Sequence, residues 1–149
     1  MLSIAHAAAG AFIATKINNP WLSGPIIVAT HFLQDYIPHW DVGQGLTKKL
    51  KSKHAAFIQE LVTDFPASII FVYFLYQASS TSINYQAWFG WFMALLPDFL
   101  EFPYLFLNLR FFPIKQIANL HNRFHHSTPN KWKGLWPQIL VILLVLYFN

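Results

Sequence analysis

Apolar segments of helical length follow one another along almost the whole chain of 149 residues, and short loops with turn residues separate them. Hydrophobic residues make up 55% of the sequence and charged residues only 11%, whereas about a quarter of the residues in a soluble domain are charged. Because such a chain cannot cover its surface with polar groups, the sequence predicts an all-α integral membrane protein. Its length suits a single domain, residues 1–149. The absence of cysteine excludes disulfides and thiolate metal sites.

We expect a bundle of five membrane helices and one amphipathic interfacial helix. The membrane helices are expected at residues 2–17, 21–37, 54–77, 85–109 and 135–148, with Pro66 interrupting the third. The first two are short for a perpendicular span, which needs about 20 residues. The first also lacks the basic start of a signal peptide, so it is expected to be retained, and its small residues would let a neighbouring helix approach closely. Residues 113–128 are typical of a basic helix on a membrane surface.

The loop lysines predict the orientation. The clearest positive-inside signal is the loop with Lys48, Lys49, Lys51 and Lys53. If each membrane helix crosses once, this loop, the N-terminus and residues 110–133 share one side, which then holds nine of the ten Lys and Arg residues. That side is therefore expected to be cytoplasmic. Because the basic residues lie beside apolar segments, we expect membrane lipid as a partner and no nucleic acid.

The stretch HFLQDYIPHWD combines two histidines and two aspartates within an otherwise apolar context. Its four candidate metal ligands are His31, Asp35, His39 and Asp41. The first two are four residues apart, so on a helix they project from one face, one turn apart. Pro38 is expected to end this helix and to free the second pair to fold back. Imidazole and carboxylate ligands suit a divalent metal, zinc first and manganese or iron as alternatives. A buried polar network without metal is the competing interpretation.

Further candidates fall on the same predicted side of the membrane. The motif LLPDFLE sets Asp98 and Glu101 three residues apart, so both can serve one site as ligands, or as ligand and base. Pairing of these carboxylates with Lys or Arg is the alternative. His121 and His125 in NLHNRFHHST have helical spacing and are candidate ligands. The remaining candidates are His6 as a ligand, Glu60 as a base unless it pairs with Lys or His, and Arg123 as a phosphate-binding group.

Two of these patterns resemble known families. The spacing His-x-x-x-Asp-x-x-x-His, with a proline before the last histidine, resembles the core of the zinc-dependent phospholipase C and single-strand zinc nuclease superfamily. The layout of the chain, the PD motif and the late HHST resemble small bacterial inner-membrane metal-dependent hydrolases of the YdjM type. The resemblance implies a multi-pass protein of the inner membrane and the ligands His31, Asp35 and His39, together with the site residues Asp98, His121 and His125. The chain departs from these families because it lacks an N-terminal Trp ligand and has Glu101 where the membrane family usually has Asp.

The sequence thus predicts a membrane-bound metal-dependent hydrolase with its site at the cytoplasmic interface. The metal would activate water, Glu101 or Glu60 would act as base, and Arg123 would bind an anionic phosphate. A site at headgroup depth favours a phosphoester of a phospholipid or another amphipathic substrate. The alternative is a non-catalytic metal-binding membrane protein, which is either a structural or interaction subunit or a metal-ion transporter. Transport is disfavoured because the last three membrane helices are apolar in their outer halves.

Overall fold

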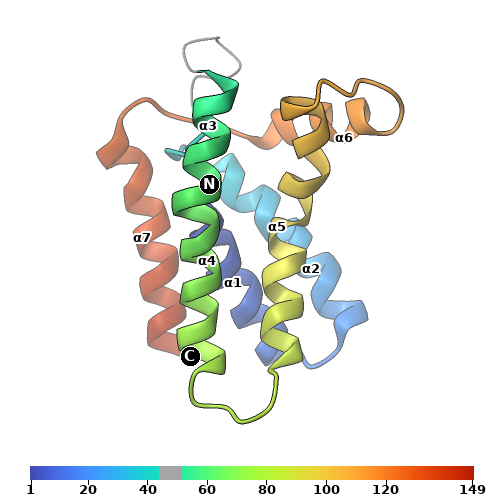
Figure 1. The fold of residues 1–149 in the computed structure, drawn as a ribbon. Coiled ribbons are helices and arrows are strands. Elements are labelled where there is room, and N and C mark those ends of the chain that lie inside the picture. The colour runs from blue at the N-terminus through green and yellow to red at the C-terminus, as the bar shows by residue number, and fades with distance from the viewer. Residues whose placement is uncertain (44–51) are drawn as a thin grey trace.

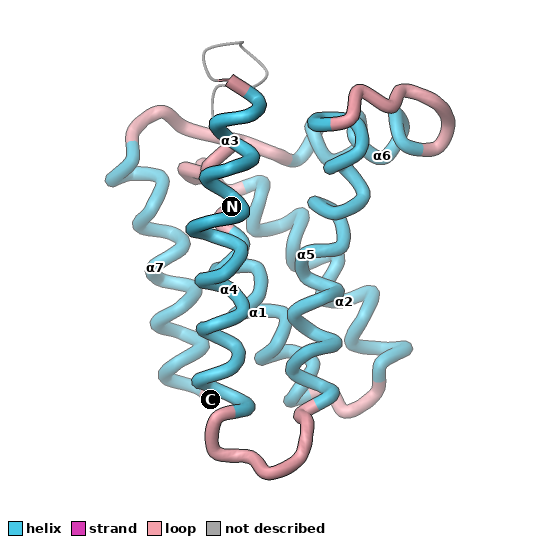
Figure 2. Tube along the Cα trace, in the orientation of Figure 1, coloured by secondary structure: helices cyan, strands magenta, loops and turns pink. Residues whose placement is uncertain are grey.

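The computed structural model describes residues 1–43 and 52–149, which fold into one bundle of helices (Figure 1). The all-α prediction is confirmed, since the described residues contain no β-strand and the helices are joined by short loops (Figure 2). Lys48, Lys49 and Lys51 of the expected positive-inside loop lie outside the described residues. The elements are α1 (Ser3–Lys16), α2 (Pro20–Tyr36), α3 (Lys53–Gln59), η1 (Glu60–Asp64), α4 (Phe65–Val72), η2 (Tyr73–Gln77), α5 (Tyr85–Phe106), α6 (Ile114–Phe124) and α7 (Lys131–Phe148).

The observed helix ends lie close to the expected ones, but most prolines do not interrupt the helices. Pro38 does end α2, because Ile37 before it adopts the extended conformation that a following proline favours. The helix from Lys53 to Gln77 instead continues through Pro66, and the π-helical segment η1 ends two residues before that proline. The start of α7 is four residues earlier than expected because Asn130 caps its N-terminus, its side chain accepting a hydrogen bond from Lys133 N.

Helix α1 is the centre of the bundle and packs against α2, α4, α5 and α7 (Figure 1). Six of its 14 residues are alanine, and nine of its residues are buried. The expected close helix approach is confirmed where Gly10 of α1 meets Gly90 of α5, since a Cβ on either glycine would overlap the other's carbonyl oxygen. The crossing fixes the two helices that carry His6 and Asp98.

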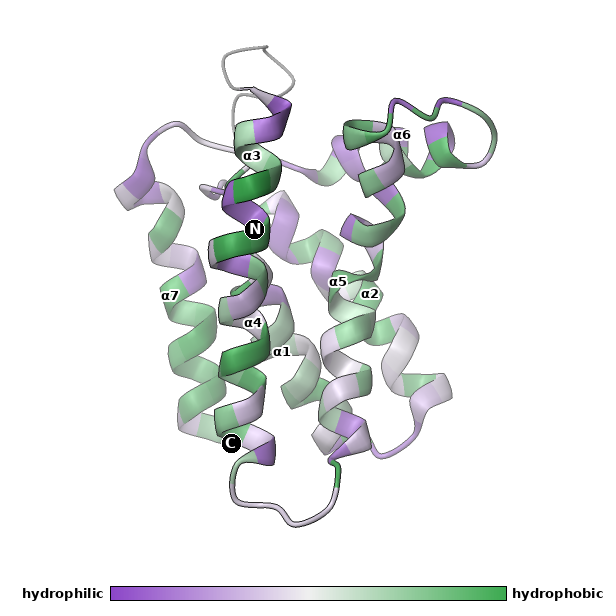
Figure 3. Ribbon diagram, viewed as in Figure 1, coloured by the Kyte–Doolittle hydropathy of each residue, from purple (hydrophilic) through white to green (hydrophobic). Residues whose placement is uncertain are grey.

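The outer surface of the bundle is apolar along much of its length. The exposed fractions of Val62, Phe74 and Leu143 are 68%, 71% and 53%. Hydrophobic residues cover the lower parts of α4 and α7, while many hydrophilic residues gather at the end that carries α6 (Figure 3). Two helices, Lys53–Gln77 and Lys131–Phe148, are long and apolar enough to cross a membrane, and the other described helices fall short in length or apolarity. Two of the described helices are thus candidate spans, and the five-span arrangement stays a prediction.

Candidate metal centre

The end of α2 carries the first candidate ligands into the interior. His31 and Asp35 are fully buried one turn apart, and His31 Nε2 lies 3.2 Å from Asp35 Oδ2. After the helix ends, the chain turns back and brings His39 Nε2 to 3.7 Å from Asp35 Oδ1. Asp41 follows, with its Oδ2 atom 3.4 Å from His39 Nε2. The fold-back expected from Pro38 is confirmed.

Backbone hydrogen bonds tie the segment after α6 to the segment after α2. His39 N donates to His126 O at 3.1 Å, His126 N donates to Asp35 O at 2.9 Å, and Thr128 N donates to His39 O at 2.7 Å. This parallel pairing sets His125 beside His39, with their Nε2 atoms 3.2 Å apart. Two segments separated by about 90 residues thereby present their histidines to one point. The neighbouring His126 is exposed and is not one of the clustered histidines.

A first group of four side chains could hold a metal ion: His31, Asp35, Asp98 and His121. One ligand atom from each lies within 4.8 Å of the others. His31 Nε2 is 3.3 Å from His121 Nε2, which is in turn 2.8 Å from Asp35 Oδ2. Asp98 Oδ1 completes the group at 3.7 Å from His31 and 3.6 Å from His121. The convergence of the PD motif of α5 and the histidine motif of α6 on α2, expected from the topology, is confirmed.

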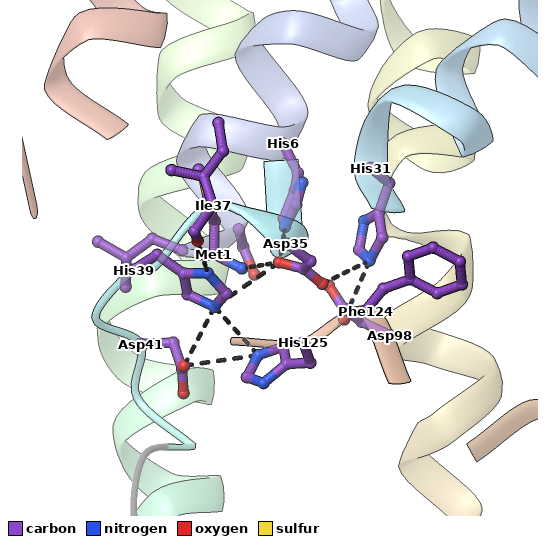
Figure 4. A network of polar contacts seen from close by, with 12 residues as sticks. Met1, His6, His31, Asp35, Ile37, His39, Asp41, Asp98, Phe124 and His125 are labelled. Carbon is purple, nitrogen blue, oxygen red and sulfur yellow. Dashed lines mark hydrogen bonds and ion pairs between the residues drawn. The ribbon is translucent and has the colours of Figure 1, made fainter. Parts of the chain in front are cut away.

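A second group that could hold a metal ion contains Asp35, His39 and His125. Asp41 lies beside it, since its Oδ2 atom is 3.5 Å from His125 Nε2 and forms no hydrogen bond despite being buried. Asp35 belongs to both groups. Its Oδ2 atom faces His31, whereas its Oδ1 atom faces His39 (Figure 4). The Oδ2 atom also lies 2.8 Å from His121 Nε2.

The hydrogen bonds of the imidazole rings indicate which nitrogens are available. A carbonyl oxygen only accepts, so His31 Nδ1 must donate to Ala94 O at 2.7 Å and His39 Nδ1 to Ile37 O at 2.8 Å. In their neutral forms both rings then present a lone pair at Nε2, toward Asp35. His121 Nδ1 is likewise held by Glu101 Oε2 at 2.5 Å. Histidine ligands in metal sites commonly have such a partner on the second nitrogen, because it fixes the tautomer and the ring orientation.

The distances between ligand atoms fit a small divalent ion. Ligand atoms bonded tetrahedrally at ~2.0–2.1 Å lie about 3.3–3.4 Å from each other. In the first group, His31 Nε2 lies 3.2 Å from Asp35 Oδ2, 3.3 Å from His121 Nε2 and 3.7 Å from Asp98 Oδ1. In the second group, His39 Nε2 lies 3.2 Å from His125 Nε2 and 3.7 Å from Asp35 Oδ1. A neutral imidazole nitrogen facing another at such a distance is unfavourable unless a proton or a cation lies between them. The donor set of nitrogen and oxygen atoms is the one that zinc, manganese and iron accept.

The electrostatics of the cluster also favour a cation. Burial by itself would lower the pKa of His121, but hydrogen bonds to Asp35 and Glu101 outweigh it and raise the pKa to about 10. Burial would raise the pKa of Asp41, yet the nearby imidazoles of His39 and His125 hold it below its usual value. Burial lowers the pKa of His125 to about 4, so its ring is neutral at pH 7 and able to bind metal.

The cluster contains more carboxylates than fixed positive charges. Its acidic members are Asp35, Asp41, Asp98 and Glu101. Within residues 1–43 and 52–149, the ion pairs of these carboxylates involve histidines and the amino group of Met1, and no Lys or Arg side chain. The expected alternative, pairing of Asp98 and Glu101 with Lys or Arg, is therefore absent from the described part of the chain. A divalent cation would compensate this buried negative charge.

Residues near the start of the chain border both groups. His6 Nε2 lies 3.1 Å from Asp35 Oδ1, and the His6 ring stacks on that of His31 with centroids 3.9 Å apart. His6 Nδ1 is buried without a hydrogen-bond partner. The amino group of Met1 forms an ion pair with Asp35 Oδ1 (Figure 4). Sequence reasoning missed Met1, because the contact is made by its amino group and not by its side chain. The identity of the residue therefore gave no signal.

The three expected catalytic groups occupy different surroundings. Glu101 is buried and accepts hydrogen bonds from His121 Nδ1 and from Asn122 Nδ2, the latter at 3.1 Å. Glu60 accepts a hydrogen bond from Ser3 Oγ at 2.8 Å and lines the cavity described below. Arg123 is exposed and is absent from the cavity lining. Asn122, which sequence reasoning missed, follows His121 directly, and its position in a polar run was the available signal.

A cavity of about 410 Å³ borders the metal groups. Residues of both groups line it, including Asp98, His121 and His125, and Asp41 lines it as well. The side chain of Asp98 is 37% exposed, unlike that of Asp35. Structural metal sites are closed by protein ligands, whereas catalytic sites leave a position open to solvent or substrate. This cluster has the open arrangement.

Comparisons with protein-family models, with curated proteins and with solved structures found no match to this chain. The resemblance to membrane hydrolases of the YdjM type therefore stays a prediction. What the described residues establish is a buried set of histidines and carboxylates that could hold a metal ion and that borders a cavity.

Proposed function

We propose that this protein is a membrane-bound metal-dependent hydrolase of phosphoesters. The observation that carries the proposal is the open side of the metal groups, because Asp98 and His121 belong to the first group and also line a cavity large enough for a substrate. Zinc is the expected ion, with manganese or iron as alternatives. We further propose that the two groups hold two ions and that the two oxygens of Asp35 are shared between them.

The residues around the cavity have separate roles in this proposal. A bound divalent ion supplies the Lewis acidity that activates water and neutralises charge on the phosphoester. Glu60 accepts the proton of the attacking water, while the water oxygen bonds to phosphorus and the ester P–O bond breaks; the proton then passes to the leaving alkoxide. Glu101 is a positioning residue, because its hydrogen bond to Nδ1 of His121 keeps Nε2 of that ring aimed at the metal.

Replacing Glu60 with glutamine tests the assignment of the base. Purified protein loaded with zinc or manganese should hydrolyse an aryl phosphodiester, and chelator should abolish the reaction. Glu60→Gln should slow turnover by about 10²–10⁴-fold with metal content unchanged, because the amide keeps the shape but cannot accept the proton. Glu101→Gln should instead weaken metal affinity by about 10–100-fold. Release of nitrophenolate and elemental analysis provide the two measurements.

Two outcomes would redirect the proposal. Metal loss in Glu60→Gln would make Glu60 a ligand in place of a base. A metal-loaded protein inert toward phosphomonoesters, phosphodiesters and lipids would favour a non-catalytic metal-binding subunit. Transport of the ion is less well supported, because beyond the metal groups α1 packs in an apolar cluster formed by Ala7, Ala11, Val72 and Ala87, which offers no polar route.

The orientation of the protein in the membrane is tested with single cysteines, which the native chain lacks. We propose that the end of the bundle with the metal groups faces the cytoplasm, as the positive charge of the flanking loops favours. A cysteine at Ser80, in the loop between η2 and α5, should react with a membrane-impermeant reagent added to intact cells. A cysteine at Lys51 should react only after the cells are opened. Labelling of both from outside would refute this orientation.

A further inference from the structure

The cavity beside the metal groups is divided into a polar part and an apolar part. The polar part is lined by Glu60 and by three members of the metal groups, Asp98, His121 and His125. The apolar part contains three phenylalanine rings in mutual contact: Phe57, Phe102 and Phe106, with centroid distances of 5.7 Å, 5.5 Å and 5.0 Å. The proposed hydrolysis uses only the polar part of the cavity. It gives the three phenylalanine rings no role, so we consider what they could bind.

Two helices form the apolar part, and each contributes residues at four-residue steps. On α5, Phe102 and Phe106 follow Asp98 at these steps, so an apolar track begins one turn from the metal groups and extends for about 12 Å. On the helix Lys53–Gln77, the lining residues Phe57, Leu61 and Phe65 have the same spacing. A ligand that fills the cavity therefore meets carboxylates and histidines at one end and hydrocarbon walls on both sides along the rest.

The apolar part reaches the outer surface of the bundle at Leu61. This residue lines the cavity and is nevertheless 50% exposed. Its exposed neighbours Ile58 and Val62 are also apolar, and all three belong to the helix Lys53–Gln77, which is apolar and long enough to span a membrane. If the helix Lys53–Gln77 spans the membrane, an opening beside Leu61 would face hydrocarbon, and a ligand could enter it from the membrane without crossing water.

We propose that this cavity binds the hydrocarbon chain of a membrane amphiphile whose phosphoester group lies at the metal groups. The inference rests on the proposed hydrolytic function and names its class of substrate. A sugar or a nucleobase would lose its hydrogen bonds to water against the phenylalanine walls, and that loss is costly. An alkyl chain has no hydrogen bonds to lose there and gains contact with the rings. A cavity of about 410 Å³ is of the size that holds one small ligand.

The test measures how affinity depends on chain length. Methyl, butyl and octyl phosphonate are titrated against zinc-loaded protein in phosphatidylcholine nanodiscs by phosphorus NMR, and empty nanodiscs correct for partition into the bilayer. Affinity should rise by up to about fourfold for each methylene group, because each one leaves water for the apolar cavity. An affinity independent of chain length would overturn the proposal.

A matched pair of leucine substitutions locates the binding. Leu61→Trp narrows the cavity and should abolish the dependence on chain length, whereas Leu100→Trp, on the exposed part of α5 outside the lining, should keep it. Ala56→Leu also enlarges a lining residue and should likewise abolish the dependence on chain length. This second variant is needed because the tryptophan of Leu61→Trp could turn outward and leave the cavity unchanged. If affinity rises equally with chain length in all three variants, the phosphonate chain does not bind in this cavity.

Turnover of methyl nitrophenyl phosphate separates this inference from the proposed function. Hydrolysis of this short ester together with chain-independent phosphonate binding would leave the hydrolase proposal standing and overturn the chain site. Chain-dependent binding without hydrolysis of any ester would support the hydrocarbon-chain site and overturn the hydrolase proposal.

Discussion

Asp35→Ala is expected to remove both metal ions and to lower turnover by about a thousandfold or more, because a divalent ion contributes several kcal/mol to such a reaction. The carboxylate is the only side chain common to the two groups that could hold metal. His31→Ala and His39→Ala each delete a ligand of one group alone. Elemental analysis should therefore find two ions in the native protein, one in each histidine variant and none in the aspartate variant.

A neighbouring pair of histidines provides the control for this experiment. His125 belongs to the second group, whereas the next residue, His126, is exposed and donates to Phe124 O. His125→Ala should lower the metal content, and His126→Ala should leave it unchanged. Retention of both ions in Asp35→Ala would end the shared-carboxylate arrangement. A single ion in the native protein would likewise contradict it.

Local sequence patterns were sufficient to predict the part of the site on α2. The spacing of His31 and Asp35 determines that both face one side of a helix, and Pro38 determines where that helix ends. These are properties of neighbouring residues. The convergence of Asp98 and His121 on the same point was also predicted, since an alternating topology leaves the ends of the helices that carry them on one side of the membrane.

Roles that depend on distant contacts could not be predicted. Glu101 and Glu60 are indistinguishable in the sequence, but only Glu101 is bonded to a histidine of the cluster, through a contact across 20 residues. Arg123 is two residues from His121 along α6, yet it is exposed and absent from the cavity lining, because residues two apart on a helix lie on different faces. The aromatic cavity was missed because its walls come from two helices whose pairing the sequence does not specify.

The prolines show how a local rule can fail in an apolar bundle. Pro97 and Pro103 lie inside α5, and Pro137 lies inside α7, without ending either helix. A proline removes one hydrogen bond and crowds the preceding turn, but neighbouring helices can hold such a helix together. At Pro38 the local rule holds, and the residues after it pair with the segment after α6 through His39. Tertiary contacts therefore decide whether a proline is tolerated inside a helix.

Gly90→Ala is expected to destabilise the protein strongly, although alanine is the better helix former. The new Cβ would overlap the carbonyl group of Gly10 and lie 2.8 Å from Ala11 Cα. These are backbone atoms, so no change of side-chain rotamer can relieve the overlap. Separating α1 from α5 should cost about 3 kcal/mol, the upper end of the usual range for overpacking. Thermal unfolding in detergent should then occur roughly 10 °C lower.

The control for this prediction is Gly24→Ala in α2, where the added Cβ would meet only side-chain atoms, the nearest being Phe89 Cζ at 3.4 Å. Its stability should change by less than about 1 kcal/mol, because the gain in helix propensity is offset by the restriction that Pro25 places on the preceding residue. Gly90→Ala should also lose metal before it unfolds, since α1 carries His6 and α5 carries Asp98. If Gly90→Ala unfolds at the same temperature as Gly24→Ala, the close crossing of α1 and α5 is not what holds the two halves of the metal centre together.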